Sequence, residues 1–263
     1  MTDISALLAD LVAESASADE LVADLPEDRW ATAVPAPGWT IAHEVAHLAW
    51  TDRQAALAAT DEDAFAETVK RAQANPTGFV DEAAEEWSRR DPAELLAQWR
   101  QGRTELAQAL GGVPSGQKLP WFGPPMAPAS MATARIMETW AHGTDIADAL
   151  GVRREPTARL RHVAHIGVRA AGFAFQVNGL PAPTEPIRVE LTGPGGETWT
   201  WNDEGAANRI TGPALDFCYL VTQRRHRDDL DLTVVGPVAE QFARVAQAFA
   251  GLPGAGRKPG EFS

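Results

Sequence analysis

The feature that most constrains the fold is a series of amphipathic helical patterns in the first 150 residues. Apolar residues recur every three or four positions, which places them along one face of an α-helix. The pattern is found in four segments, residues 4–25, 40–59, 91–111 and 130–150. Helices that each have one apolar face bury these faces against one another, so we predict a four-helix bundle over residues 1–155.

Residues at the ends of these segments support the assignment. Thr40 follows a Pro-Gly turn and suits the N-cap of the second helix, and Ser130 suits that of the fourth. Asp91 and Pro92 are typical of an N-cap followed by the first helical position. We therefore expect helices to begin at these positions.

The pattern changes after residue 155, and we predict a smaller α+β domain over residues 156–252. A helix is predicted over residues 157–178. The segments IRVELTG and ETWTWND then alternate with period two around a glycine-rich turn, which is typical of a β-hairpin. A helix, a strand and a final helix are predicted over residues 212–225, 230–236 and 237–251. The fold class is thus α+β, and residues 253–263 are predicted to form a flexible tail.

Composition narrows the function. The formal net charge of −13 argues against a protein that binds nucleic acid, since such a protein needs a basic face. No run of about 18 apolar residues is present, so we expect no membrane span, and the acidic N-terminus lacks the basic region of a signal peptide. Cys218 is the single cysteine, which excludes an internal disulfide and fits the reducing cytoplasm. We expect a cytoplasmic protein that acts on a small molecule.

The sequence HEVAH, residues 43–47, matches the H-E-x-x-H pattern of zinc metalloproteases. Such an enzyme uses both histidines as ligands, the glutamate to activate water, and a third ligand. The glycine and histidine that follow in one class of these enzymes are absent. Glu67, at a workable distance for another class, lies in an otherwise ordinary acidic helix. A metalloprotease remains an alternative to an amphipathic helix that carries two histidines by chance.

A second group of polar residues lies in the fourth helical segment. Glu138 and His142 are four residues apart and share one helix face, with Arg135 one turn before them and Asp145 one turn after. A carboxylate and an imidazole at this spacing are able to hold one metal ion, and His47 on the second segment is the obvious third ligand. Three ligands from two facing helices leave an open position for water or substrate. The alternative is an ion pair on the helix surface.

Two segments, PGWTIAHEVAHLAW and METWAHGTDIADALG, together resemble the DinB-like metal-dependent superfamily, and within it the mycothiol-dependent maleylpyruvate isomerase type. The segment ITGPALDFCYLVTQRRHRDDLDLTVVG resembles the C-terminal region of the same family. The resemblance implies a four-helix first domain and a divalent metal, which we take as Zn²⁺, on His47, Glu138 and His142. His43 is then an extra histidine, and Glu44 is not a catalytic base.

The resemblance also implies thiol chemistry with mycothiol as co-substrate. Mycothiol belongs to actinobacteria, many of which have GC-rich genomes. Only three of the 23 basic residues are lysines, and this preference for arginine agrees with a GC-rich coding sequence.

An acidic substrate needs a cation, and the resemblance points to an arginine in the segment TQRRH. Arg224 is our first candidate and Arg225 the reserve, because a guanidinium binds a carboxylate through two hydrogen bonds. The alternative is an arginine pair at the surface near Asp228 and Asp229.

Four more residues are candidates for the site. Arg135 binds substrate or pairs with Glu138 or Asp145. Asp145 orients His142 as a partner of a metal ligand, with an acid at the surface as the alternative. Trp121 and Met126 line the pocket for the co-substrate, with ordinary packing as the alternative.

These observations predict a metal-dependent isomerase or S-transferase that uses mycothiol and acts on a small acidic or electrophilic substrate. A cation at the three ligands would favour the thiolate form of the thiol. Two alternatives remain open. One is a hydrolase that activates water at the same metal, and the other is a metal-binding protein without catalysis.

Overall fold

The computed structural model describes residues 4–251 and 253–262. The chain divides into two compact units, Met1–Arg154 and Glu155–Ser263, so the division lies one residue before the predicted one. Residues 253–262 of the predicted tail belong to the second unit, where the backbone N–H of Gly260 donates to Asp229, and Ser263 lies outside the described residues. The mobility of this segment stays a prediction.

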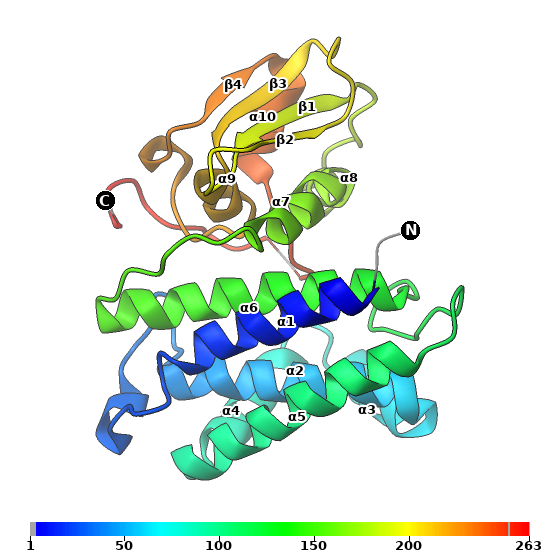
Figure 1. Ribbon diagram of the computed structural model, residues 1–263, viewed down its shortest axis with the longest axis vertical. Helices are drawn as coiled ribbons and strands as arrows, with labels where there is room; N and C mark the ends of the chain where they lie inside the picture. Colours follow the sequence, from blue (N-terminus) through cyan, green and yellow to red (C-terminus); the bar gives the residue numbers. More distant parts are fainter. Residues whose placement is uncertain (1–3, 252, 263) are drawn as a thin grey trace. The chain divides into compact units, whose positions relative to one another are not determined.

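Four long helices build the first unit (Figure 1), as predicted. They are α1 (Ile4–Asp19), α2 (Ile41–Thr60), α5 (Pro92–Gly112) and α6 (Pro128–Leu150). Helix α2 packs against both α5 and α6, and α1 packs against the same two helices. The unit also has two shorter helices that the four-helix prediction did not include, α3 (Glu62–Ala74) and α4 (Phe79–Ser88), and a 3₁₀ turn, η1 (Glu27–Ala31).

The helix ends follow local chemistry. Thr40 caps α2, and Asp91 accepts hydrogen bonds from the backbone N–H groups of Ala93 and Glu94 at the start of α5. Two predictions were wrong. Helix α6 begins at Pro128 rather than at Ser130, because proline suits the first helical position, and α1 ends at Asp19 rather than at residue 25.

The interior of the first unit contains two clusters of buried apolar side chains. One includes Val45, Leu48, Leu95 and Trp99, and the other includes Phe65, Leu106, Leu110, Met131 and Ile136. Both clusters draw on helices that lie far apart in the sequence. They hold α2 in place against α5 and α6. This packing sets the positions of the polar side chains that α2 and α6 bring together.

The second unit contains a four-stranded sheet in the order β2-β1-β3-β4. Its elements are α7 (Leu160–Arg169), α8 (Ala171–Val177), β1 (Ile187–Thr192), β2 (Thr198–Trp201), β3 (Asn208–Pro213), α9 (Ala214–Val221), η2 (Arg227–Asp229), β4 (Thr233–Val235) and α10 (Pro237–Val245). Strands β1 and β2 form the predicted antiparallel hairpin, with Val189 opposite Trp201. Strand β1 also pairs in parallel with β3, a strand that the sequence analysis missed.

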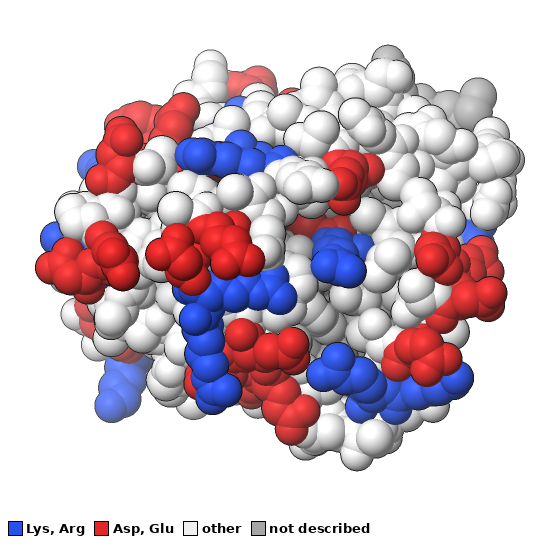
Figure 2. All heavy atoms as spheres, turned by 90° about the horizontal axis from the view of Figure 1, so that it is seen from below, with Lys and Arg blue, Asp and Glu red and all other residues white. Residues whose placement is uncertain are grey.

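The predicted helix over residues 157–178 is two helices, α7 and α8, which are separated at Ala170. In Figure 1, α10 lies behind the sheet of this unit. No helix among the described residues is long and apolar enough to cross a membrane. On the face that Figure 2 shows, acidic and basic side chains alternate and form no continuous basic area.

Candidate metal centre

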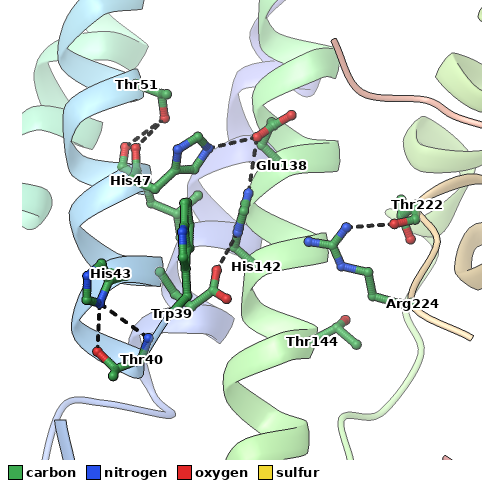
Figure 3. A network of polar contacts seen from close by, with 12 residues as sticks. Trp39, Thr40, His43, His47, Thr51, Glu138, His142, Thr144, Thr222 and Arg224 are labelled. Carbon is green, nitrogen blue, oxygen red and sulfur yellow. Dashed lines mark hydrogen bonds and ion pairs between the residues drawn. The ribbon is translucent and has the colours of Figure 1, made fainter. Parts of the chain in front are cut away.

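Three side chains from α2 and α6 converge in the first unit (Figure 3). The Nε2 atom of His47 lies 3.1 Å from Oε2 of Glu138, and Nε2 of His142 lies 3.3 Å from the same oxygen. One ligand atom from each residue lies within 4.8 Å of the other two. We call these three residues the ligand cluster. They are the residues that the sequence predicted as metal ligands.

A fourth side chain orients His142 from the opposite side. Glu44 is fully buried on α2, and its Oε2 forms a hydrogen bond with Nδ1 of His142. The Nδ1–H group therefore donates to Glu44, which leaves Nε2 as the atom that faces Glu138 and His47. A carboxylate that binds the second nitrogen of a histidine ligand fixes its tautomer and its orientation.

The sequence analysis assigned this role to Asp145. Asp145 is 1% exposed, and one of its carboxylate oxygens lies within 4.8 Å of atoms of Glu44 and His142. Glu44 is the carboxylate that makes the hydrogen bond. The sequence contained a sign of this, because Glu44 lies one turn before His47 and so faces α6 with it.

Burial and neighbouring charges shift the pKa values of the three residues in the ligand cluster. Burial and the neighbouring His142 lower the pKa of His47 to about 4, so its ring is neutral. Burial also disfavours the charged form of His142, but Glu44 and Glu138 outweigh it and raise the pKa of His142 to about 9. Burial acts to raise the pKa of Glu138, yet its hydrogen bonds with the two histidines hold it well below the usual range. Glu138 of the cluster and the neighbouring Glu44 thus stabilise one positive charge on His142.

His43 is held outside the ligand cluster. Its Nδ1 accepts a hydrogen bond from the backbone N–H of Thr40 at 3.3 Å, and its Nε2 lies 2.8 Å from Oε2 of Glu85. Both ring nitrogens are therefore engaged at the start of α2. Neither group of potential metal ligands among the described residues includes His43. A metalloprotease needs His43 and His47 on one metal, and this geometry does not support it.

Trp39 forms an aromatic wall beside the ligand cluster, a position that the sequence analysis missed. Its ring stacks on that of His142, with centroids 6.0 Å apart, and lies 5.6 Å from the ring of His47. The indole N–H donates to Asp81 on α4 at 3.2 Å, which fixes the ring. The only sign in the sequence was the position of Trp39 directly before the N-cap of α2.

Arg135 pairs with a different partner from those expected. Its Nε donates to Oδ1 of Asp52 at 2.8 Å, and the indole N–H of Trp99 donates to Oδ2 of the same carboxylate at 3.1 Å. Arg135 is 2% exposed and Asp52 is 1% exposed. We call Asp52, Trp99 and Arg135 the ion-pair cluster. This geometry supports a structural role for Arg135, and its role in substrate binding stays a prediction.

Trp121 and Met126 pack against the core of the first unit. The ring of Trp121 lies parallel to that of Phe65, with centroids 5.7 Å apart, and the backbone of Met126 pairs with that of Leu119. The packing alternative accounts for these contacts. A role for either residue in co-substrate binding stays a prediction.

Arg224 and Arg225 belong to the second unit and follow α9. Arg224 donates from Nη1 to the carbonyl oxygen of Thr222 at 2.6 Å (Figure 3). The guanidinium of Arg225 lies over the ring of Tyr219, 4.6 Å from its centroid. A role for either residue toward the substrate stays a prediction.

The donor set of the ligand cluster fits a divalent metal such as Zn²⁺. Zinc in proteins binds imidazole nitrogen and carboxylate oxygen at about 2.0–2.2 Å, and three protein ligands are typical of a catalytic site. Separations of 3.1 and 3.3 Å between donor atoms suit ligands around one ion. The carboxylate of Glu44 adds the hydrogen bond that such histidine ligands normally make.

Residues 11–147 match the family model described as the mycothiol maleylpyruvate isomerase N-terminal domain. The chain belongs to this family. The match contains the whole ligand cluster and Glu44. Residues 183–234 match a second family model, described as wyosine base formation, which spans β1 to β3, α9 and Arg224.

Other similar proteins match most of the chain. Uncharacterized proteins from two strains of Mycobacterium tuberculosis, CDC 1551 and H37Rv, are each 59% identical over 257 residues, which is 98% of this chain and 100% of theirs. Crystal structures of the mycothiol-dependent maleylpyruvate isomerase and of a mutant of it superpose with TM-scores of 0.58 and 0.60. Each covers 88% of this chain and 93% of its own at 14% identity, which establishes a common fold.

Proposed function

We propose that this protein is an isomerase that uses mycothiol and a divalent metal, Zn²⁺, held by His47, Glu138 and His142. Its substrate is a small acidic or electrophilic molecule. The observation that carries the proposal is the convergence of two Nε2 atoms and one carboxylate oxygen on one point between α2 and α6. Membership of the mycothiol maleylpyruvate isomerase family supports the choice of thiol and of reaction.

Each of four residues has a distinct task in this proposal. A cation at the ligand cluster would stabilise a bound thiol as its thiolate, which is the nucleophilic form. Glu44 keeps the proton on Nδ1 of His142 and so keeps Nε2 available. Trp39 shields one side of the cluster from water. Arg224 binds a carboxylate of the substrate through its guanidinium.

An S-transferase would use the same site in a similar way, because the same thiolate would add to an electrophile and stay attached to it. A hydrolase on the same three ligands is the second candidate, since a metal site with an open position also activates water. A binding protein without catalysis would keep the metal and show no turnover.

Cobalt-substituted protein tests the thiol. Adding mycothiol should produce a sulfur-to-cobalt charge-transfer band in the wild type and in His43→Ala, and no band in His142→Ala. His43 is a matched control because it lies on the same helix and also contacts a glutamate. Absence of a band in wild-type protein that holds its cobalt would favour the hydrolase.

The role of Arg224 needs a separate test. Arg224→Ala should weaken the binding of an acidic substrate by about 2 kcal/mol, which is the size of a charge-assisted hydrogen bond. It should leave the charge-transfer band unchanged. Arg161→Ala, at an exposed arginine of the same unit, is the control. Equal effects of the two substitutions would remove Arg224 from the site.

A further inference from the structure

Helix α4 presents two carboxylates to the start of α2. Asp81 and Glu85 are four residues apart and therefore lie on one face of α4. The indole N–H of Trp39 donates to Oδ1 of Asp81 at 3.2 Å, and Nε2 of His43 lies 2.8 Å from Oε2 of Glu85. Each carboxylate thus holds one aromatic ring, and the centroids of the two rings lie 6.1 Å apart.

The two rings differ in what they contact next. The ring of Trp39 stacks on that of His142 (Figure 3), with an angle of 19° between the ring planes and a centroid distance of 6.0 Å. This distance lies within the range of about 4.5–7 Å in which aromatic rings attract each other. His43 lies outside the ligand cluster. Asp81 is therefore connected to the ligand cluster through one side chain, whereas Glu85 holds a ring outside it.

The stacked indole adds a restraint that the polar contacts of His142 do not supply. Glu44 forms a hydrogen bond with Nδ1, and Oε2 of Glu138 lies 3.3 Å from Nε2. Contacts at these two nitrogens fix the line that joins them, but the ring plane is still able to turn about that line. A flat ring stacked on the imidazole opposes this turn. Because the lone pair of Nε2 lies in the ring plane, the orientation of the plane affects how well this atom binds a metal.

We propose that Asp81 is a positioning residue of the metal centre. Its hydrogen bond to Trp39 keeps the indole ring against His142, and the held ring slows the loss of metal from the ligand cluster. Helix α4, which carries none of the three ligands, is thereby linked to the centre. The inference deepens the proposed function and rests on it for the presence of the metal.

The first measurement needs no metal. The chain has six histidines, so full-length protein with isotope-labelled histidine gives a small set of ring signals in an NMR spectrum. The signal that is missing in His142→Ala belongs to His142. A stacked indole shifts this signal through its ring current. Asp81→Ala should therefore move the signal toward its position in Trp39→Ala, whereas Glu85→Ala should leave it in place.

The second measurement is the rate at which zinc-loaded, full-length protein releases zinc to an excess of chelator. Asp81→Ala should release zinc about tenfold faster than wild type, as expected for an indirect partner of a metal ligand. Asp81 is exposed, so this change should not disturb folding. Asp81→Asn should stay close to wild type, because its side-chain oxygen still accepts the hydrogen bond. Glu85→Ala removes the same charge from the same face of α4, and as the matched control it should also stay close to wild type.

A double-substitution cycle isolates the contact between Asp81 and the indole. Trp39→Phe keeps an aromatic ring but lacks the N–H group, so adding Asp81→Ala to this variant should not speed zinc release further. Equal effects of Asp81→Ala in the two backgrounds, or an effect of Glu85→Ala as large as that of Asp81→Ala, would overturn the inference. Wild-type protein that holds no zinc would contradict the proposed function. Zinc-loaded protein with the same release rate in wild type and Asp81→Ala would contradict this inference alone.

Discussion

Two buried polar clusters join the same two helices, α2 and α6, and they differ in how their charged side chains are arranged. In the ion-pair cluster, the carboxylate of Asp52 accepts from both Arg135 and Trp99, so one charge neutralises the other. In the ligand cluster, the Nε2 atoms of His47 and His142 both face a single oxygen of Glu138. The first arrangement pairs a positive with a negative side chain, whereas the second is suited to a cation.

The protonation of the histidines makes the contrast sharper. The pKa of His47 falls to about 4, mainly through burial, while two carboxylates raise the pKa of His142 to about 9. The pKa values of two histidines whose ring centroids lie 4.4 Å apart are thus shifted in opposite directions. A site that keeps one buried imidazole neutral and provides two carboxylates for a positive charge is typical of functional rather than structural groups.

The largest effect is expected from removing a member of the ligand cluster. Glu138→Ala or His142→Ala should lower the affinity for Zn²⁺ by about a thousandfold or more, since even indirect partners of ligands contribute 10–100-fold. Competition with a chromophoric chelator measures this affinity. His43→Ala should stay close to wild type. A variant without His43 that loses its metal, while Glu138→Ala keeps it, would restore the metalloprotease interpretation.

Breaking the ion-pair cluster should affect stability instead of metal binding. Asp52→Asn leaves the guanidinium of Arg135 buried without its counter-charge, and we expect a loss of about 3 kcal/mol in the free energy of unfolding. Urea denaturation of the metal-free protein measures this loss. The folded variant should still bind one equivalent of zinc. If Asp52→Asn empties the metal site at full stability, the two clusters are not separate.

Glu44 offers an intermediate test, because it contacts the ligand cluster without being part of it. Glu44→Gln removes the charge that orients His142, and the affinity for zinc should fall by about 10–100-fold. Cobalt at saturating concentration should restore the charge-transfer band with mycothiol in this variant. A complete and irreversible loss of activity with the metal still bound would make Glu44 a catalytic base.

The sequence alone predicted those residues of the two clusters whose position follows from their spacing along a helix. The i, i+4 relation of Glu138 and His142 and the position of His47 sufficed to predict the ligand cluster. The partner of Arg135 was different from those expected, Glu44 was not predicted as a partner of His142, and the role of Asp145 toward His142 stays a prediction. The prediction considered acids on α6, whereas Asp52 and Glu44 lie on α2, and helix packing decides which α2 side chains face α6. Strand β3 was missed for a similar reason, because pairing with β1 stabilises it.

The smallest effect is expected far from both clusters, at the junction of α1 and α5. Asp19 binds Arg100 and Arg103 at the end of α1. Burial acts to raise its pKa, but hydrogen bonds and the charges of the two arginines lower it below 3.8. A lowered carboxyl pKa stabilises the folded state above the unfolded pKa, and this contribution is lost as pH falls through the folded pKa.

Asp19→Asn should therefore lower the free energy of unfolding by about 1 kcal/mol at pH 7, a modest value because Arg100 is half-exposed. The difference from wild type should shrink as pH falls below about 4. Thermal unfolding at a series of pH values measures it. A difference that stays constant down to acid pH would show that the ion pair is not its source.

X-ray absorption at the zinc edge tests the central claim most directly. Zinc-loaded wild-type protein should show nitrogen and oxygen ligands near 2.0–2.1 Å, including two imidazoles, and mycothiol should add one sulfur near 2.3 Å. His43→Ala should give the same spectra, and His142→Ala should lose one imidazole. A zinc shell that mycothiol leaves without sulfur, or one that is identical in wild type and His142→Ala, would contradict the account.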